Sequence, residues 1–127
     1  MSSDDTRFPT EWPANCPPAD AVEGPLTVFR AVKDFPNDHD EFKSASETGK
    51  HKNACPCQRL GISVQETLRD ALHHREAYPY RGNIIVGVIG REHGNAKATP
   101  TKKQSGHWTW WPSEGLDRTS IFTLHAE

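Results

Sequence analysis

The pattern of apolar residues predicts four β-strands along the chain. In residues 26–32 (LTVFRAV), successive side chains point to opposite faces of the predicted strand, so that Arg30 shares one face with aliphatic side chains. Residues 83–89 are a short, almost continuous β-branched run between glycines, which predicts a strand buried on both faces at the centre of the sheet. Two more strands are expected at residues 107–111 and 119–125.

Two helices are expected between these strands. Asn37 is a suitable N-cap for a short helix that ends at Gly49. Ser63 followed by Glu66 matches the capping-box pattern, so a second helix is predicted to begin at Ser63 and to end before Pro79. The apolar stripe of this second helix consists of Val64, Leu68, Ala71 and Leu72.

The remaining segments complete the predicted organisation. Residues 92–106 show no periodicity and are expected to form a long surface loop. Residues 26–127 are therefore predicted to form one small α+β domain, with one mixed or antiparallel sheet and two helices packed on it. Residues 1–25 hold five of the ten prolines and carry a charge of -4, which predicts an extended acidic arm whose Phe8 and Trp12 dock on the domain or on a partner.

Composition and charge narrow the classes of partner. The 15 basic and 17 acidic residues give a formal net charge of only -2, so binding to nucleic acid or to a membrane is not expected. The lysines between Lys97 and Lys103 are interpreted as a solvated loop. No apolar run reaches the roughly 18 residues that span a bilayer, and residues 1–18 do not resemble a signal peptide. We therefore expect a soluble, cytoplasmic protein.

The cysteines give little support to a metal site. Three cysteines are an odd number, which favours reduced thiols over a disulfide framework. Cys55 and Cys57 are weak zinc candidates, with His51 and His107 as conceivable partners, but a single residue separates them, whereas paired zinc ligands are usually two to four residues apart. Zinc is therefore not expected. The sequence also lacks the motifs of metalloproteases, thioredoxin-like proteins and nucleoside triphosphatases.

Arg30 is the first candidate for ligand binding. A guanidinium keeps its charge at neutral pH, so among aliphatic neighbours it needs a carboxylate, backbone carbonyls or an anionic ligand such as a phosphate. Glu47 and Glu66 are the internal carboxylates considered. An edge position with a solvated head group is a further alternative.

The tryptophan-rich segment that begins at His107 is the second candidate. Strand alternation places His107, Thr109 and Trp111 on one face and Trp108 and Trp110 on the other. The first face fits a pocket wall, in which the imidazole titrates near neutral pH beside a hydroxyl. Alternatively, the tryptophans fill a small core and donate their N–H groups to carbonyls.

Two serines complete the candidates. Ser63 has a structural explanation as a helix cap, although a serine at a helix start is also well placed to bind an anionic ligand. Ser44 lies close to Glu47 in the segment DEFKSASETG, residues 40–49. Neither serine has the Gly-x-Ser-x-Gly context of a hydrolase nucleophile.

Five segments together resemble a family of small, functionally uncharacterised bacterial and phage proteins, a resemblance that implies no activity. They are the CPP segment at residues 16–18, FRAV at 29–32, EFKSASETG at 41–49, GISV at 61–64 and HWTWW at 107–111. A looser resemblance is to ADP-ribosyltransferase-type domains, in which an early Arg or His, a later hydroxyl residue and a later acid or His face one NAD-binding cleft. It matches Arg30, Ser63 and His107 to those positions and implies NAD as cofactor, although the Gln/Glu-x-Glu motif of such domains is absent.

Two functions are therefore expected. In the first, an NAD or nucleotide pocket, Arg30 holds the phosphates, Ser63 positions them, Trp110 or Trp111 stacks on a ring and His107 acts as base or orienting group. Ser63 and His107 are the catalytic residues in this hypothesis. Ser44, Glu47 and Thr109 are assigned to ligand binding in this hypothesis. In the second, a non-catalytic module, such as a phage or defence-system inhibitor or an accessory factor, binds a protein through the arm, the lysine loop and exposed tryptophans.

Overall fold

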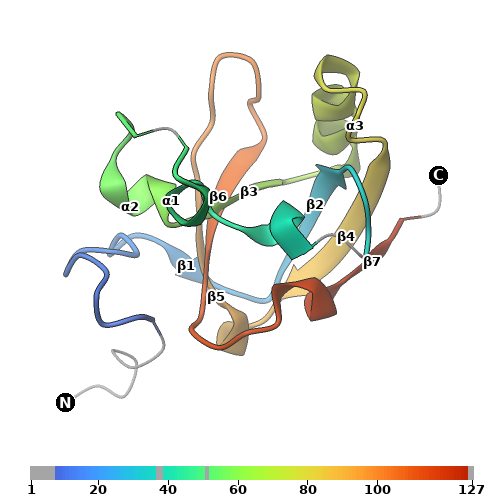
Figure 1. Ribbon diagram of the computed structural model, residues 1–127. Coiled ribbons are helices and arrows are strands. Elements are labelled where there is room, and N and C mark those ends of the chain that lie inside the picture. The colour runs from blue at the N-terminus through green and yellow to red at the C-terminus, as the bar shows by residue number, and fades with distance from the viewer. Residues whose placement is uncertain (1–7, 37–38, 51, 126–127) are drawn as a thin grey trace.

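The computed structural model describes residues 8–36, 39–50 and 52–125. These residues form a single α+β domain built on one antiparallel sheet in the order β1-β5-β6-β3-β2-β4-β7 (Figure 1), as the sequence predicts. The strands are β1 Val22–Glu23, β2 Leu26–Val32, β3 Ile62–Gln65, β4 Asn83–Ile89, β5 Gly94–Ala98, β6 His107–Pro112 and β7 Phe122–Leu124. The helices are α1 Ala45–Thr48, α2 Pro56–Arg59 and α3 Leu68–Ala77, with 3-10 turns at His39–Phe42, Arg91–His93 and Arg118–Ile121.

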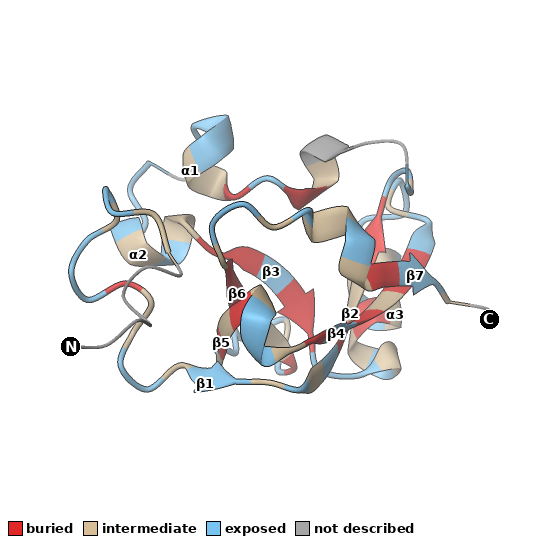
Figure 2. Cartoon of the chain, turned by 90° about the horizontal axis from the view of Figure 1, so that it is seen from below, coloured by how far each residue is buried: buried red, intermediate tan, exposed pale blue. Residues whose placement is uncertain are grey.

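The sheet buries apolar side chains on both faces. One face carries the larger cluster, which consists of Val28, Val32, Phe42, Ile62, Val64, Ile85, Ile89, Ala96, Trp110 and Phe122. On the other face α3 packs against β2 and β3, and Ala71 of the helix contacts Ala31 and Ile84. Figure 2 shows the buried residues concentrated on the central strands, whereas α1 and α2 remain partly or fully exposed. Burial of this kind is the main stabilising contribution in a small domain.

The join between β2 and β3 divides the sheet into two parts. Among the described residues, Phe29 and Gln65 are the one registered pair between these strands, whereas β2 pairs with β4 along its whole length. The ladder is therefore weak at the join, and polar side chains of both strands lie there. Helix α3 covers the join because it packs on both strands.

The predicted helix start at Ser63 is wrong. Ser63 lies in β3, Ile62–Gln65, and α3 begins at Leu68 after the N-cap Thr67, whose hydroxyl accepts a hydrogen bond from the backbone N–H of Asp70 at 3.1 Å. Ile62, Val64 and Gln65 are buried, and the segment pairs with β6 over its whole length, so tertiary pairing overrides the local capping pattern. Ser63 is consequently held on a strand, with its side chain exposed.

The first predicted helix is correct only at its end. Gly49 terminates α1 in the left-handed conformation, at φ 74°. The helix begins after Ser44, which forms a capping box with Glu47, and not after Asn37. Asn37 itself lies outside the described residues.

The strand predictions need three corrections. β4 has the predicted bounds but is the second strand from the sheet edge, and its Val88 is 49% exposed, so β3 occupies the centre instead. The expected loop at 92–106 contains β5, whose sequence GNAKA carries no strand signal and is ordered by pairing with β6. The last predicted strand is reduced to β7 because residues 118–121 form a 3-10 turn.

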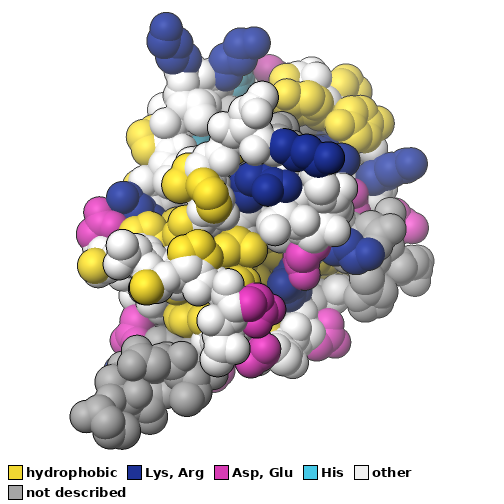
Figure 3. Space-filling view, turned by 60° about the vertical axis from the view of Figure 1, so that its left-hand side comes forward, with side chains coloured by type: hydrophobic (Ala, Val, Ile, Leu, Met, Phe, Trp, Pro, Cys, Tyr) yellow, Lys and Arg dark blue, Asp and Glu magenta, His cyan; other side chains and the backbone are white. Residues whose placement is uncertain are grey.

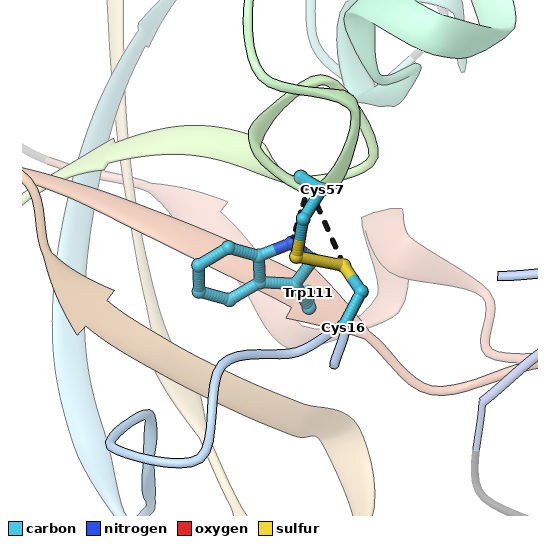
Figure 4. The surroundings of a disulfide bond; sticks show 3 residues. All are labelled: Cys16, Cys57 and Trp111. Atoms are coloured by element: carbon cyan, nitrogen blue, oxygen red, sulfur yellow. Dashed lines mark hydrogen bonds between the residues drawn. A yellow bond between two sulfur atoms is a disulfide. The ribbon is translucent and has the colours of Figure 1, made fainter. Parts of the chain in front are cut away.

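The N-terminal arm is tied to the sheet. β1 pairs with β5, and Cys16 forms a disulfide with Cys57 of α2, with 5.4 Å between the two Cα atoms (Figure 4). The expectation of reduced thiols is therefore wrong for these two residues, because folding brings together two segments 41 positions apart. In the arm, Phe8 and Trp12 stack on each other with 5.6 Å between ring centroids and are half-buried.

Candidate functional site

A polar cavity of about 140 Å³ lies at the join of β2 and β3, beside α3. It is lined by Arg30, Ala31, Ser63, Gln65, His74, Arg81, Thr101, Gln104 and His107. The structure thus brings Arg30, Ser63 and His107 to one cavity from β2, β3 and β6. The roles assigned to these three residues stay predictions.

Ser63 and His107 form a hydrogen-bonded pair at this cavity. The pairing of β3 with β6 sets Gln65 opposite His107 and Ser63 opposite Thr109, so both side chains lie on the same face of the sheet. Ser63 Oγ lies 2.9 Å from His107 Nε2. This is the geometry of a hydroxyl and the base that removes its proton.

The other ring nitrogen of His107 fixes the tautomer. Nδ1 lies 3.0 Å from the carbonyl oxygen of Thr99 and 2.9 Å from its hydroxyl, which in turn lies 2.8 Å from the hydroxyl of Thr109. Because a carbonyl only accepts, Nδ1 carries the proton and Nε2 of the neutral ring accepts from Ser63. Burial lowers the pKa of His107, and the positive charge of Arg30 lowers it further. The hydrogen bond to the Thr99 backbone acts in the opposite direction, but the pKa remains below its ordinary value. His107 is therefore neutral, and able to act as a base, at pH 7.

Arg30 satisfies its charge with carbonyls. Its guanidinium donates to the backbone oxygens of Ser63 and Glu41, and it lies 5.9 Å from the centroid of the Phe42 ring. Among the described residues, no carboxylate forms an ion pair with Arg30, so neither Glu47 nor Glu66 has the role considered from the sequence. Burial, with the charge of Arg81, lowers the pKa of Arg30 to about 10, and the side chain stays cationic at neutral pH.

Arg81 and His74 bring a second cation to the cavity. Arg81 Nη1 donates to His74 Nε2 at 3.0 Å, so the proton of the neutral imidazole is on Nδ1. Burial lowers the pKa of His74, and the charge of Arg81 lowers it further. The guanidinium of Arg81 also lies over the rings of Tyr78 and Tyr80, at 5.4 and 5.5 Å from their centroids.

Two properties of the lining point to an anionic ligand. Two guanidinium groups line the cavity, and none of the Asp or Glu side chains that the structure describes does. In addition, three of the four buried side-chain polar atoms without a hydrogen bond in the described residues belong to lining residues, namely Arg30 Nε, Gln65 Oε1 and His74 Nδ1. Buried polar atoms are normally paired, so a cluster of unpaired ones marks a place where a polar ligand is bound.

Two exposed lysines lie on a loop that contributes to the cavity. The loop between β5 and β6, which supplies Thr101 and Gln104 to the lining, also carries Lys102 and Lys103, both exposed. This loop and α3 occupy the upper part of the molecule in Figure 1. Figure 3 shows Lys and Arg side chains gathered in the upper half of the face that it presents, where few acidic side chains lie.

Ser44 and Glu47 do not line the cavity. Ser44 is buried and caps α1 together with Glu47. The Glu47 carboxylate also binds Arg118, with 2.6 Å between Oε1 and Nη1. Burial alone would raise the pKa of Glu47, but the bonds from Arg118 and from the Ser44 backbone outweigh it, and the pKa is lowered. Both residues therefore have a structural role, and they also line a separate hollow of about 430 Å³ together with Arg118. Their assignment to ligand binding stays a prediction.

The two candidate tryptophans also have a structural role. Trp110 and Trp111 are 0% and 2% exposed, and their indole N–H groups donate to the carbonyls of His93 and Cys57. The core alternative is thus correct, and neither ring is available to stack on a ligand or to form a partner surface. Thr109 is buried as well and does not line the cavity. Its hydroxyl is hydrogen-bonded to the hydroxyl of Thr99, which contacts His107.

The zinc candidates do not form a site. Cys57 is in the disulfide, which leaves Cys55 as an exposed free thiol. Within the described part of the chain, no three His, Cys, Asp or Glu side chains are placed to hold a metal ion. His51 lies outside the described residues.

Six of the nine lining residues were missed from the sequence, namely Ala31, Gln65, His74, Arg81, Thr101 and Gln104. His74 lies in the last turn of α3, where a basic residue is also favoured by the helix dipole. Arg81 lies beyond Tyr78, the C-cap of α3, so helical spacing gives no signal for it. Gln65 and Gln104, which bond to each other at 2.9 Å, gave no signal at all.

Comparisons with known proteins identify no relative of this chain. No family model, curated protein or solved structure matches this chain. The resemblances drawn from the sequence stay predictions. Separately, none of the helices in the described ranges combines the length and the apolar character needed to cross a membrane.

Proposed function

We propose that the cavity binds the phosphate group of a small phosphate ester, and that Ser63 and His107 perform acid–base chemistry on this ligand. The observation that carries the proposal is the pair of guanidinium groups, Arg30 and Arg81, which face a cavity that no described acidic side chain lines. Guanidinium groups bind phosphate through charge-assisted hydrogen bonds. The NAD and nucleotide ligands expected from the sequence belong to this class.

The size of the cavity suits a head group. At about 140 Å³ it is smaller than the roughly 300 Å³ or more of pockets that enclose a whole drug-sized ligand. A phosphate fits inside, while the rest of the ligand extends over the surface. Arg81 lines the cavity directly, whereas Arg30 Nε and His74 Nδ1 are unpaired but fully buried atoms that a phosphate oxygen would reach only after a side-chain movement.

The chemistry follows from the Ser63–His107 pair. Neutral His107 accepts the proton of Ser63 Oγ, and the oxygen attacks the phosphorus of the bound ester. The new bond joins Ser63 Oγ to phosphorus, the bond between phosphorus and the alcohol oxygen of the ester breaks, and protonated His107 returns the proton to the leaving alcohol. The two arginines stabilise the negative charge that develops there. Thr99 holds the imidazole in the required tautomer throughout.

The binding half of the proposal is tested by calorimetric titration with ribose 5-phosphate and, as ligand control, with ribose. We expect the phosphate ester to bind with a Kd of about 1 mM or below and ribose not to bind. Arg81→Gln should weaken binding at least about tenfold, because a hydrogen bond to a charged group is lost. The matched control is Arg69→Gln, an exposed position on α3 that removes the same charge outside the lining. Equal affinity in both variants, or no binding at all, would contradict the proposal.

The catalytic half is tested by labelling with a fluorophosphonate. The reagent forms a bond between Ser63 Oγ and phosphorus and releases fluoride, while the hydroxyl proton passes to His107. We expect labelling at Ser63 by mass spectrometry, and a rate at least about 100-fold lower in His107→Gln. Ser120 is the internal control, since it is exposed and its hydroxyl donates to the carbonyl of Asp117. Equal labelling of the two serines would contradict an activated hydroxyl.

A further inference from the structure

Two exposed tyrosines stand beside the phosphate cavity. Tyr80 is 59% exposed and Tyr78 is 41% exposed, which places them among the few large apolar side chains left on the described surface. Both rings contact Arg81, a residue of the cavity lining. An aromatic surface therefore begins where the cationic cavity ends.

The two rings have different surroundings. Tyr78 lies between elements of the site, with its centroid 4.8 Å from that of His74 and with Arg81 over the ring. Tyr80 meets the edge of Tyr78 at 85° and contacts Arg81 on one side only, at 5.5 Å. Tyr78 thus supports His74 and Arg81, while the greater exposure of Tyr80 leaves part of its ring open to solvent.

The structure assigns Tyr80 as the stacking surface for the base of a nucleotide whose phosphate is bound by Arg81 and Arg30. This inference rests on the proposed phosphate site and narrows its ligand class from phosphate esters to nucleotides. Arg81 lines the cavity and its Cζ lies 5.5 Å from the centroid of the Tyr80 ring, so the ring is adjacent to the phosphate site, as the base is close to the phosphate in a mononucleotide. The buried Trp110 and Trp111 cannot supply this contact.

Stacking on Tyr80 does not select one base over another. Every base has a π-face, and base–aromatic stacking tolerates all of them. The contribution of one stacked base corresponds to an affinity gain of about tenfold. We therefore expect AMP and CMP to bind alike, and both to bind more tightly than ribose 5-phosphate.

The test compares AMP with ribose 5-phosphate by calorimetry in four proteins, namely the unmodified chain, Tyr80→Ala, Tyr80→Phe and Leu124→Ala. Leu124 is 56% exposed on β7 and serves as the matched truncation of an apolar side chain outside the cavity lining. We expect AMP to bind about tenfold more tightly than ribose 5-phosphate. Tyr80→Ala should abolish this advantage and leave ribose 5-phosphate unchanged, whereas Tyr80→Phe and Leu124→Ala should retain it.

Three results would overturn the inference, and they can be told apart. Equal affinity for the two ligands in the unmodified chain means that no base is bound, while the phosphate site stands. An equal loss of both affinities in Tyr80→Ala means that the ring acts only by holding Arg81. Failure of both ligands to bind removes the phosphate site and the base subsite together.

Discussion

Ser63 Oγ lies 2.9 Å from Nε2 of His107, although 44 positions separate the two residues in the chain. The contact depends on the antiparallel register of β3 with β6, which aligns Ser63 with Thr109 and Gln65 with His107. Thr99 then holds the far side of the imidazole. A shift of β3 by one residue would send the Ser63 side chain to the face opposite His107, so the pair reports directly on the register of the sheet.

The protonation state of His107 is the first prediction. Burial and the nearby charge of Arg30 lower its pKa, so titration followed by nitrogen-15 NMR should give a value below 6.5. At pH 7.5 the spectrum should show the neutral ring with its proton on Nδ1. A midpoint above 6.5, or a proton on Nε2, would contradict the proposed base.

Stability should fall in mild acid. Both His74 and His107 have a pKa below the ordinary 6.5, so between their folded values and 6.5 the unfolded chain binds more protons than the folded one. The free energy of unfolding therefore decreases as pH falls below 6.5, and the loss is complete once both rings are protonated in the folded state. Denaturation with urea at pH 7.5 and pH 5.5 measures it. His107→Gln should show a smaller decrease, and a rise in stability toward pH 5.5 would disprove the assignment.

The disulfide should stabilise the fold. Cys16 and Cys57 close a loop across 41 positions, for which chain entropy gives about 3 to 4 kcal/mol. We expect Cys16→Ser, or reduction with dithiothreitol, to lower the melting temperature. Cys55→Ser is the control, since this thiol is exposed and free, and should leave it unchanged. Equal melting temperatures before and after reduction would show that the bond does not form.

The capping pair near α1 should affect stability alone. Glu47→Gln weakens the ion pair with Arg118, and because both side chains are partly exposed, the cost is about 1 kcal/mol or less. The affinity for ribose 5-phosphate should stay the same, since Glu47 does not line the cavity. A change in the affinity for ribose 5-phosphate without a change in the free energy of unfolding would show that Glu47 takes part in ligand binding.

The sequence is informative where a single face or a single run decides the structure. The alternation around Arg30 and the β-branched run at 83–89 predict β2 and β4 with their observed bounds. The same alternation, read at His107, predicts a strand that starts at the correct residue. Together these patterns identify Arg30 and His107, which meet Ser63 at the cavity.

The sequence is misleading where pairing between distant segments decides. The capping-box pattern at Ser63 is a local signal, and pairing with β6 overrides it, so a helix was expected in place of a strand. β5 has no local signal and exists through its partner strand. The odd number of cysteines likewise does not reveal that Cys16 reaches Cys57. Arg81 was missed because its significance depends on where α3 ends relative to the sheet.

The most direct measurement is the mapping of a bound phosphate ester by proton–nitrogen-15 NMR, which follows the side-chain Nε–H signals of the arginines. Adding ribose 5-phosphate should shift the Nε–H of Arg30, which has no hydrogen bond in the structure, together with the backbone signal of Ser63 and the ring signals of His74. The signal of Arg59, which donates to the carbonyl of Lys50, should stay in place. Shifts at Arg59 without shifts at Arg30 would contradict a phosphate site at the join of β2 and β3.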